Sequence, residues 1–256
     1  MSTTTVRFPP TVPRLVVDRS RYATTFPHLV GFVESTPGLS EADGEATIAL
    51  PGAACHPVFA LLAESVVSDE LEVWAEGYVF RREPSSDPMR MMSFRQTEVI
   101  RLGSKEVVAE SVGSALARCR RMLKQWGIDT SEDTATDSFA GRLATLRHQL
   151  QRDAGSKREL SFSMWSERGE YSGTALASAN LHGMRFGEDF DIRRQDGSAV
   201  VSGCVGLGLE RTVLALLRTH GADLAYWPQA LIEDFALVGI EDREGTANVR
   251  ATNHES

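Results

Sequence analysis

From residue 80 the sequence reads Phe80-Arg81-Arg82-Glu83, then a short loop, then Arg90-Met91-Met92-Ser93-Phe94. Side chains two residues apart on an extended strand share a face, so Arg81 and Glu83 are expected to lie together. Arginine forks onto phosphate oxygens, and a glutamate accepts a hydrogen bond from an exocyclic amine. Arg90 offers a second phosphate contact and Phe94 a flat surface for a purine. Either half alone would suit a surface hairpin with scattered charges, but both in this order predict an ATP clamp.

A second pattern lies further along the chain, where Gly206-Leu207-Gly208-Leu209-Glu210-Arg211 opens an apolar segment that predicts a helix. A glycine such as Gly208 is needed where a Cβ would collide with a ligand, and the helix would present Arg211 to that ligand. Alone, this pattern could be an ordinary strand-to-helix turn. Together the two patterns resemble motifs 2 and 3 of the class II aminoacyl-tRNA synthetases.

The class II resemblance assigns roles around ATP to the residues of both patterns. It implies that Arg81 holds the α-phosphate and Arg90 the γ-phosphate, while Glu83 meets the adenine amine. Phe94 and Arg211 would enclose the adenine ring, with Gly208 leaving room beside it. The positively charged arginines beside the phosphates would stabilise the negative charge that develops on them during the reaction. The catalytic residues implied are therefore Arg81, Arg90 and Arg211.

Composition sets outer limits on the function. The chain has 256 residues, of which 42% are hydrophobic and 24% charged, as in an ordinary globular protein. A net charge of −8 and a pI near 5.3 argue against a broad nucleic-acid-binding surface. The sequence shows neither a membrane-spanning apolar stretch nor a secretory signal. Three widely spaced cysteines, an odd number, indicate a reducing cytoplasm.

Residue periodicity predicts an α+β fold, because strands and helices form separate runs. Strands are expected at 45–50, 71–82, 91–102, 159–165, 170–179 and 199–205. Helices are expected at 57–67, 105–126, 139–152, 209–219 and 228–238, with a polar linker at 131–138. We therefore expect an antiparallel sheet flanked by helices, of the class II synthetase type. It would form a single domain over 1–240 with a two-helix insertion at about 104–155 and a disordered tail at 241–256.

Two cysteines and a glutamate form a candidate metal site. Cys55 lies at a strand-to-helix turn, and Cys204 comes just before Gly206. Glu98 is four residues past Phe94 and so shares its side of the strand. If the class II resemblance holds, all three converge beside the nucleotide. Two thiolates and a carboxylate with one open position suit catalytic zinc, although a lone cysteine is more simply a small buried hydrophobe.

These three positions resemble the zinc site of the methanogen-type seryl-tRNA synthetases. The chain resembles still more closely the amino acid:[carrier protein] ligases, which are truncated homologues of that catalytic core. The matching stretches are Arg7-Phe8-Pro9-Pro10, Phe26-Pro27, Ala54–Pro57, Phe80–Ser85, Ser93–Glu98, Ser202–Val205, Thr219–Gly221 and Trp227-Pro228. They cover the chain from residue 7 to about residue 238.

The ligase resemblance implies a zinc ion that binds the amino group of a small amino acid, glycine or alanine. The amino acid would be activated with Mg²⁺ and ATP as an aminoacyl-adenylate and passed to the phosphopantetheine thiol of a carrier protein. Ser178 and Asn180 lie where the family lines the amino-acid pocket, although Asn180 could equally satisfy a strand end. Thr174 stands where seryl enzymes have a magnesium-binding glutamate, which leaves the number of magnesium ions open.

A basic cluster on the first inserted helix offers a surface for a partner. Arg118, Arg120, Arg121 and Lys124 stand close together in an acidic chain. They could be a solvated helix face, but the corresponding insertion of the ligases docks the carrier. An acidic carrier protein would complement this charge.

The resemblance also bears on oligomeric state and on competing functions. Class II enzymes form dimers, so we expect a homodimer, although the usual motif 1 helix is not found before Pro9-Pro10. We see no room for a tRNA-binding domain and expect no tRNA partner. The alternatives are an enzyme that charges tRNA or another nucleophile, and a non-catalytic paralogue. A non-catalytic paralogue need not keep both the ATP clamp and the metal trio.

Overall fold

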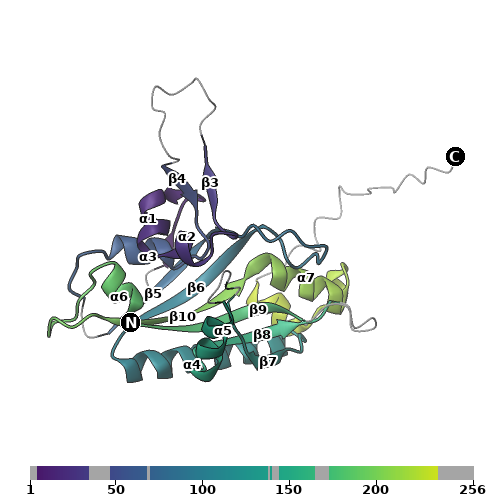
Figure 1. The fold of residues 1–256 in the computed structure, drawn as a ribbon. Coiled ribbons are helices and arrows are strands. Elements are labelled where there is room, and N and C mark those ends of the chain that lie inside the picture. The colour runs from purple at the N-terminus through teal and green to yellow at the C-terminus, as the bar shows by residue number, and fades with distance from the viewer. Residues whose placement is uncertain are drawn as a thin grey trace.

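The computed structural model describes residues 5–34, 47–67, 70–137, 139, 144–164 and 173–235. A seven-stranded sheet runs through the centre of the molecule, with the strand order β1-β5-β6-β10-β9-β8-β7 (Figure 1). Neighbouring strands are antiparallel except for the parallel pair of β1 and β5. The predicted antiparallel sheet with flanking helices is confirmed, whereas the tail at 241–256 lies outside the described residues.

The strand bounds follow the predictions closely at the centre of the sheet and less closely at its edge. The two strands of the clamp pair without a shift from Leu71↔Leu102 to Phe80↔Ser93. The seven strands are β1 Thr5–Arg7, β5 Leu71–Phe80, β6 Ser93–Gly103, β7 Ser131–Thr134, β8 Lys157–Phe162, β9 Thr174–Gly183 and β10 Val201–Gly208.

A small N-terminal unit lies on one side of this sheet. It has a three-stranded sheet in the order β2-β4-β3, with its own apolar core that includes Val17, Tyr22 and Ala49. Its elements are β2 Val12–Pro13, α1 Arg14–Arg19, α2 Tyr22–Thr25, β3 Gly31–Val33 and β4 Ile48–Leu50. The next helix, α3 His56–Leu61, leads from this unit to the large sheet. It ends before the predicted Val67.

Strand β6 supplies side chains to both faces of the large sheet, because alternate residues of a strand point in opposite directions. Phe94 and Ile100 pack on one face against α3 and against α6 Arg185–Asp189. Val99 points to the other face, where α4 Lys105–Gln125 packs. One strand therefore joins two separate cores.

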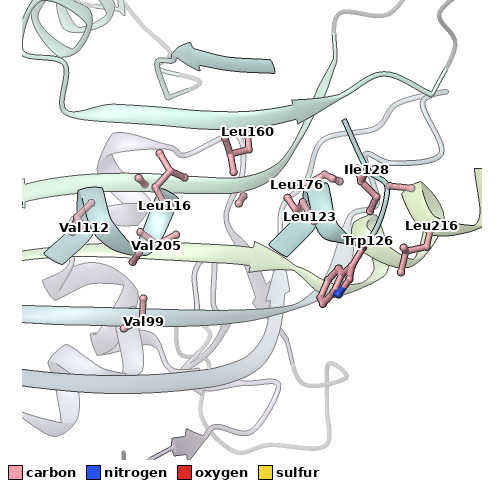
Figure 2. Close-up of a cluster of buried hydrophobic side chains, with 14 of the residues drawn as sticks. Val99, Val112, Leu116, Leu123, Trp126, Ile128, Leu160, Leu176, Val205 and Leu216 are labelled. Carbon is pink, nitrogen blue, oxygen red and sulfur yellow. The ribbon is translucent and has the colours of Figure 1, made fainter. Parts of the chain in front are cut away.

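The long helix α4 confirms the predicted amphipathic segment. It begins after Ser104, whose side chain accepts a hydrogen bond from the Val107 amide at 3.3 Å and so caps the helix. Its apolar stripe lies along the sheet on the side away from α1–α3 (Figure 1). Figure 2 shows Val112, Leu116 and Leu123 of this stripe, together with Leu160 and Val205 of the sheet.

The C-terminal helices complete the face that α4 covers. The first, α7, spans Leu209–His220 and contributes Ala215 and Leu216 to the same core. It is followed by a 3-10 turn, η1 Leu224–Tyr226, and by α8 Gln229–Asp234. Among the described residues, no helix is both long and apolar enough to cross a bilayer.

The two helices of the predicted insertion pack differently. Both helices follow the clamp strands in the chain, but α4 is a layer of the central core rather than an added element. The second helix, α5 Ala144–Asp153, buries none of its side chains, and residues 140–143 just before it lie outside the described part of the chain. The two helices therefore have different structural roles.

The segment expected as a polar linker contains the edge strand β7. Its four residues are exposed and polar, so no apolar alternation marks them as a strand. The strand forms because its backbone pairs with β8 and because Glu132 bridges Arg120 of α4 and Arg158 of β8, at 3.3 and 3.1 Å. Pairing with a neighbour, rather than local sequence, decides this element.

Candidate active site

A cavity of about 230 Å³ lies between the small N-terminal unit and the large sheet. Its floor comes from β6, β9 and β10, and its walls from α3, α6 and the N-terminal unit. The side chains that carry its polar character are Cys55, His56, Arg81, Glu83, Gln96, Glu98, Asp137, Gln151, Lys157, Ser178, Asn180, His182, Arg185 and Cys204. The cavity thus joins the predicted metal residues to the first half of the predicted ATP clamp.

Cys55, Glu98 and Cys204 meet at the floor of this cavity. Their ligand atoms all lie within 4.8 Å of one another, and all three residues are buried. Each comes from a different element: Cys55 starts α3, Glu98 is in β6 and Cys204 is in β10. The sequence prediction that these residues converge agrees with this geometry.

Burial and mutual proximity favour the neutral, protonated forms of the three side chains when no cation is bound. A hydrogen bond to Cys204, together with burial, raises the pKa of Cys55 well above its usual value. The bond from Cys55 lowers the pKa of Cys204, but burial and Glu98 outweigh it and the net pKa is raised. Burial raises the pKa of Glu98 to about 7, although Cys55 and Arg81 oppose this change. Three adjacent buried acids resist ionisation together, and a divalent cation would reverse that tendency.

A carboxylate oxygen of Glu98 that makes no hydrogen bond, and a glycine opposite it, also indicate that a cation fits this site. In the described part of the chain, the buried Oε2 atom of Glu98 makes no hydrogen bond. Opposite it, a Cβ on Gly206 would lie 3.0 Å from Oε1 of Glu98 and 2.4 Å from Nε2 of Gln96. Glycine at this position leaves space for the Glu98 carboxylate. Two thiolates and a carboxylate form a donor set that suits zinc, so these residues fit such an ion.

Cys204 has polar neighbours that sequence reasoning did not identify. The Nε2 atom of His182 lies 3.5 Å from the Cys204 sulfur, and Nδ1 of the same ring lies 3.1 Å from the Ser202 hydroxyl. Burial and the nearby Arg185 lower the pKa of His182 to about 3, so the ring is neutral. Asn180 donates a longer contact to the same sulfur at 3.9 Å.

The two predicted pocket residues lie within strand β9, and both line the cavity. Ser178 donates a hydrogen bond to Glu159 at 3.1 Å. Asn180 stands well inside the strand, so the alternative that it satisfies a strand end is wrong. Its side chain instead faces Cys204.

Arg81 and Glu83 lie just beyond the end of β5, whereas Phe94 lies within β6. The amide of Arg81 donates to the Met92 carbonyl at 2.8 Å, which extends the pairing past β5. The Arg81 side chain donates to the Gly52 carbonyl at 3.3 Å and lies 5.6 Å from the Phe94 ring. Glu83 lines the cavity together with Arg81, in agreement with the predicted shared face.

Arg211 is held against the clamp from the start of α7. Its guanidinium lies 4.5 Å from the centre of the Phe94 ring and donates to the carbonyls of Met89 and Ala175 at 2.9 and 3.0 Å. Burial and the nearby Arg81 lower the pKa of Arg211 to about 10. Arg211 and Phe94 are in direct contact, so a purine could enter between them only if the guanidinium moved.

Two hydrogen bonds join Arg95 of β6 to Glu210 at the start of α7. The amide of Arg95 and its Nε atom both donate to the carboxylate of Glu210, each at 2.6 Å. Glu210 is next to Arg211, and Arg95 is next to Phe94. This contact therefore sets the register of the two residues predicted to hold the nucleotide.

Arg90 is placed in the loop before β6 and is exposed. Its Nε atom lies 3.5 Å from Oδ2 of Asp87, which also accepts the Thr174 hydroxyl at 2.6 Å. Strand β6 begins only at Ser93, two residues later than the predicted start, so Arg90 lies in the preceding loop. Thr174, where the resemblance expected a magnesium-binding glutamate, instead touches a carboxylate from the clamp loop.

The wall beside α5 is built from a hydrogen-bonded ion pair. Lys157 contacts Asp137 at 2.7 Å and Glu159 at 3.0 Å. Gln151 of α5 donates to Asp137 at 2.8 Å and accepts from the Asp137 amide at 2.7 Å. Burial alone would lower the pKa of Lys157, but Asp137 and Glu159 outweigh it and the net pKa is raised. Through these contacts α5 closes one side of the cavity.

Two further residues of the cavity carried no sequence signal. Tyr22 and His56 each have a buried polar atom without a hydrogen bond in the described part of the chain, the Tyr22 hydroxyl and Nδ1 of His56. Their rings make an edge contact with a centroid separation of 5.2 Å. Tyr22 lies outside every matching stretch, and His56 is the variable position of the stretch Ala54–Pro57, so sequence reasoning singled out neither residue.

The predicted basic cluster lies apart from the cavity. Arg118, Arg120, Arg121 and Lys124 are exposed on α4, which packs on the face of the sheet opposite Cys204. Arg120 is also paired with Glu132. All four residues are exposed, and none of them lines the cavity.

The fold and the site together define a class II synthetase core. A family model described as the tRNA synthetase class II core domain (G, H, P, S and T) matches residues 39–220. The chain therefore belongs to this family. Amino acid–[acyl-carrier-protein] ligases 1 and 2 of Bradyrhizobium diazoefficiens are each 30% identical to it, over 88% and 90% of this chain and 74% of each of those proteins. Within the class II family the chain is a member of the amino acid–[acyl-carrier-protein] ligase group.

More distant relatives agree with this placement. The type-2 serine–tRNA ligase of Methanopyrus kandleri is 26% identical over 72% of this chain and 37% of that protein. The solved seryl-tRNA synthetase of M. kandleri, in complex with tRNASec, has a TM-score of 0.75 at 20% identity and 92% coverage. That from Pyrococcus horikoshii, complexed with ATP, has a TM-score of 0.67 at 16% identity and 91% coverage. The chain spans 51% of each solved protein, and these likenesses show the fold alone.

The ion pair beside α5 leads to a stability prediction. The substitution Lys157→Met leaves Asp137 and Glu159 without their shared cation, and we expect it to lower the free energy of unfolding by about 3 kcal/mol. Adding Asp137→Asn should recover more than half of that loss, because Glu159 keeps its bond from Ser178. Urea denaturation of the single and double variants measures both values. A single variant as stable as the unmodified protein would show that this pair does not hold the wall.

Proposed function

We propose that the protein activates a small amino acid with ATP and transfers it to the phosphopantetheine thiol of a carrier protein. The observation that carries the proposal is the shared cavity. Cys55, Glu98 and Cys204 line the same space as Arg81 and Glu83. An anchor for an amine and a clamp for a phosphate therefore face one another across a small volume. Membership of the ligase group supports the identity of the acceptor.

The first step of the reaction forms the activated amino acid. A carboxylate oxygen of the amino acid attacks the α-phosphorus of ATP, and the bond to the β-phosphate oxygen breaks as pyrophosphate leaves. Arg81 would hold the α-phosphate and stabilise the charge that builds up there. Much of the remaining acceleration would come from holding the two reactants in line. The product is an aminoacyl-adenylate.

The second step transfers the aminoacyl group. The carrier thiol, as a thiolate, attacks the carbonyl carbon of the adenylate, and the bond from that carbon to the phosphate oxygen breaks. AMP leaves, and a thioester forms. The amino group must stay anchored during both steps, since the reacting carbon would otherwise move within the cavity.

We propose zinc as the ion that anchors this amine, held by Cys55, Glu98 and Cys204. When bound, zinc supplies a Lewis acid that accepts the lone pair of the substrate amine. Glu98 also extends from β6 toward the clamp residues, so one strand supports both halves of the site. Ser178 and Asn180 would contact the amino acid, and the small cavity favours glycine or alanine.

The nucleotide would occupy the clamp with magnesium bound to its phosphates. Glu83 would accept a hydrogen bond from the adenine amine, and Arg90 would bind the γ-phosphate after leaving Asp87. Phe94 would stack on the purine and Arg211 would cover its other side, once the guanidinium moves off the ring. Gly208, at the start of α7, keeps the backbone beside Arg211 free of a side chain. The cation–π contact of Arg211 with Phe94 would be replaced by one with the purine.

Amino-acid-dependent exchange of label between pyrophosphate and ATP tests the activation step. We expect exchange with glycine or alanine, and a loss of about 10²–10³-fold in the Arg81→Ala variant, because one donor to the developing charge is removed. The neighbouring Arg82→Ala is the matched control, since Arg82 is exposed and lies outside the cavity lining. Absence of exchange with every amino acid would refute the proposed activation step.

We propose that an acidic carrier docks on α4 near the edge formed by β7 and β8. The contact of Arg120, one residue of the cluster, with Glu132 of the edge strand β7 supports docking near this edge. Lys157 and α5 line the cavity from the same edge. The phosphopantetheine arm would then pass around the sheet rather than through it. Complementary charge would speed this encounter.

The docking proposal predicts a selective defect. Reversing Arg118 and Arg121 together to glutamate should slow thioester formation roughly tenfold or more at low salt, because electrostatic steering is lost. Pyrophosphate exchange should be unchanged. Lys105→Glu, at the other end of α4 and also exposed, is the control. Equal losses in exchange and transfer would instead assign these arginines a structural role, and unchanged transfer would refute docking at this surface.

We also propose a homodimer. Leu15 of α1, Leu61 of α3 and Val66 just beyond α3 are 68%, 66% and 67% exposed. α1 and α3 pack against each other. Exposed apolar side chains on adjoining elements are typical of a protein interface. Sedimentation should give a mass of twice 28.0 kDa, and a monomer at micromolar concentration would contradict the proposal.

A further inference from the structure

His182 links two residues of the neighbouring strand β10. Its Nε2 atom lies 3.5 Å from the sulfur of Cys204, and its Nδ1 atom lies 3.1 Å from the hydroxyl of Ser202. Cys204 and Ser202 are two residues apart and therefore point to the same side of the strand. The imidazole thus bridges a proposed metal ligand and a hydroxyl that is fully buried.

An irregularity in the sheet accompanies this placement of His182. Gly203 pairs with Leu181, but the next residue of β10, Ser202, pairs with Gly183. His182 is therefore the additional residue of a β-bulge. Bulges are common beside active sites, where they redirect a side chain. The bulge in β9 lies directly beside the Cys204 strand.

Aromatic packing fixes the orientation of the His182 ring. Phe186 and Phe59 contact it edge-on, with centroid separations of 4.8 and 5.8 Å and interplanar angles of 82° in both cases. A ring held in this way cannot flip, which would replace each nitrogen by a ring carbon, without displacing buried phenylalanines. The nitrogen that faces Cys204 is therefore a fixed feature of the site.

The hydrogen-bonding partners determine which nitrogen carries the proton. A neutral imidazole has one N–H donor and one acceptor nitrogen. A metal-bound thiolate can only accept, whereas a serine hydroxyl can donate. The consistent assignment has the Ser202 hydroxyl donating to Nδ1, and Nε2–H donating to the Cys204 sulfur.

We propose that His182 and Ser202 are positioning residues for the metal centre, with His182 donating its Nε2–H to the Cys204 thiolate. This inference rests on the proposed function, because it assumes an ion at Cys55, Glu98 and Cys204. Among the described residues those three form the group whose donor atoms lie within 4.8 Å of one another, and His182 is not part of it. His182 therefore acts through Cys204 and not as a ligand itself.

The donated hydrogen bond has two consequences for the ion. It holds the Cys204 sulfur in the orientation that the ion needs, so the side chain loses less conformational entropy when the ion binds. It also stabilises negative charge on the sulfur, so the thiolate gives less charge to the ion. The ion then remains a stronger acceptor for a substrate amine. Asn180 donates a second but longer contact at 3.9 Å.

Metal-binding measurements on the full chain test this inference without using catalytic activity. Zinc affinity is measured by competition with a chromophoric chelator, and Co²⁺ replacement reports on the sulfur-to-metal charge-transfer band. We expect His182→Phe, which keeps an aromatic ring between Phe59 and Phe186, to weaken zinc binding about 10–100-fold and to shift that band. His182→Gln, which can still offer an N–H, should retain most of the affinity. Ser202→Ala should weaken binding by less than His182→Phe.

Controls separate a local effect from loss of the fold. His28→Phe changes an exposed histidine and should leave both readouts unchanged. Circular dichroism of each variant shows whether it is folded, and His182→Gln and Ser202→Ala keep the test usable if His182→Phe unfolds.

Two outcomes would overturn the inference, and they differ in their meaning. If the unmodified protein binds zinc while the folded His182 and Ser202 variants match it in affinity and in the cobalt band, the positioning role is refuted but the metal site stands. If the unmodified protein binds neither ion, the inference fails together with the metal assignment. Amino-acid-dependent pyrophosphate exchange then shows separately whether the activation function survives.

Discussion

Three acidic side chains are buried within 4.8 Å of one another, and the surrounding site is arranged around that constraint. Thiolates and a carboxylate cannot all ionise at such distances without a cation, and the raised pKa values of Cys55, Glu98 and Cys204 express this conflict. A divalent ion would resolve it. Burying these three groups together costs free energy, and the proposed metal ion, as an electrophilic anchor at the floor of the cavity, would account for that cost.

Strand β6 connects this anchor to the nucleotide clamp. Phe94 and Glu98 lie on the same face of the strand, four residues apart, so a regular strand sets the spacing between the proposed purine platform and the proposed metal ligand. The double contact of Arg95 with Glu210 then fixes α7, and with it Arg211, relative to the same strand. The geometry of activation therefore depends on one rigid strand and the elements paired with it.

Sequence reasoning succeeded where the chemistry or the periodicity was local. The clamp motif correctly predicted the β5–β6 hairpin, and the apolar stripe correctly predicted α4. The Cys55–Glu98–Cys204 cluster followed from a family resemblance and from the alternation of β6. It was less successful where distant parts of the chain decide the outcome. Periodicity shows that α4 has an apolar side, but it does not show which face of the sheet that side covers.

The same limit explains the other differences between prediction and structure. β7 has no apolar alternation, because ion pairs of Glu132 and pairing with β8 hold it in place. His182 and Tyr22 belong to no motif, since packing against other elements brings them to the site. The second clamp strand was expected from residue 91, but β6 begins only at Ser93, so Arg90 lies in the preceding loop.

X-ray absorption at the zinc edge of the purified protein is the decisive test of the proposed metal site. Two sulfur neighbours are expected at about 2.3 Å and nitrogen or oxygen neighbours at about 2.0–2.2 Å, from two cysteines, a carboxylate and one exchangeable position. Addition of a stable aminoacyl-adenylate analogue should leave the two sulfurs in place and change only the lighter neighbours. A zinc ion without sulfur neighbours, or with four, would contradict the site assigned to Cys55, Glu98 and Cys204.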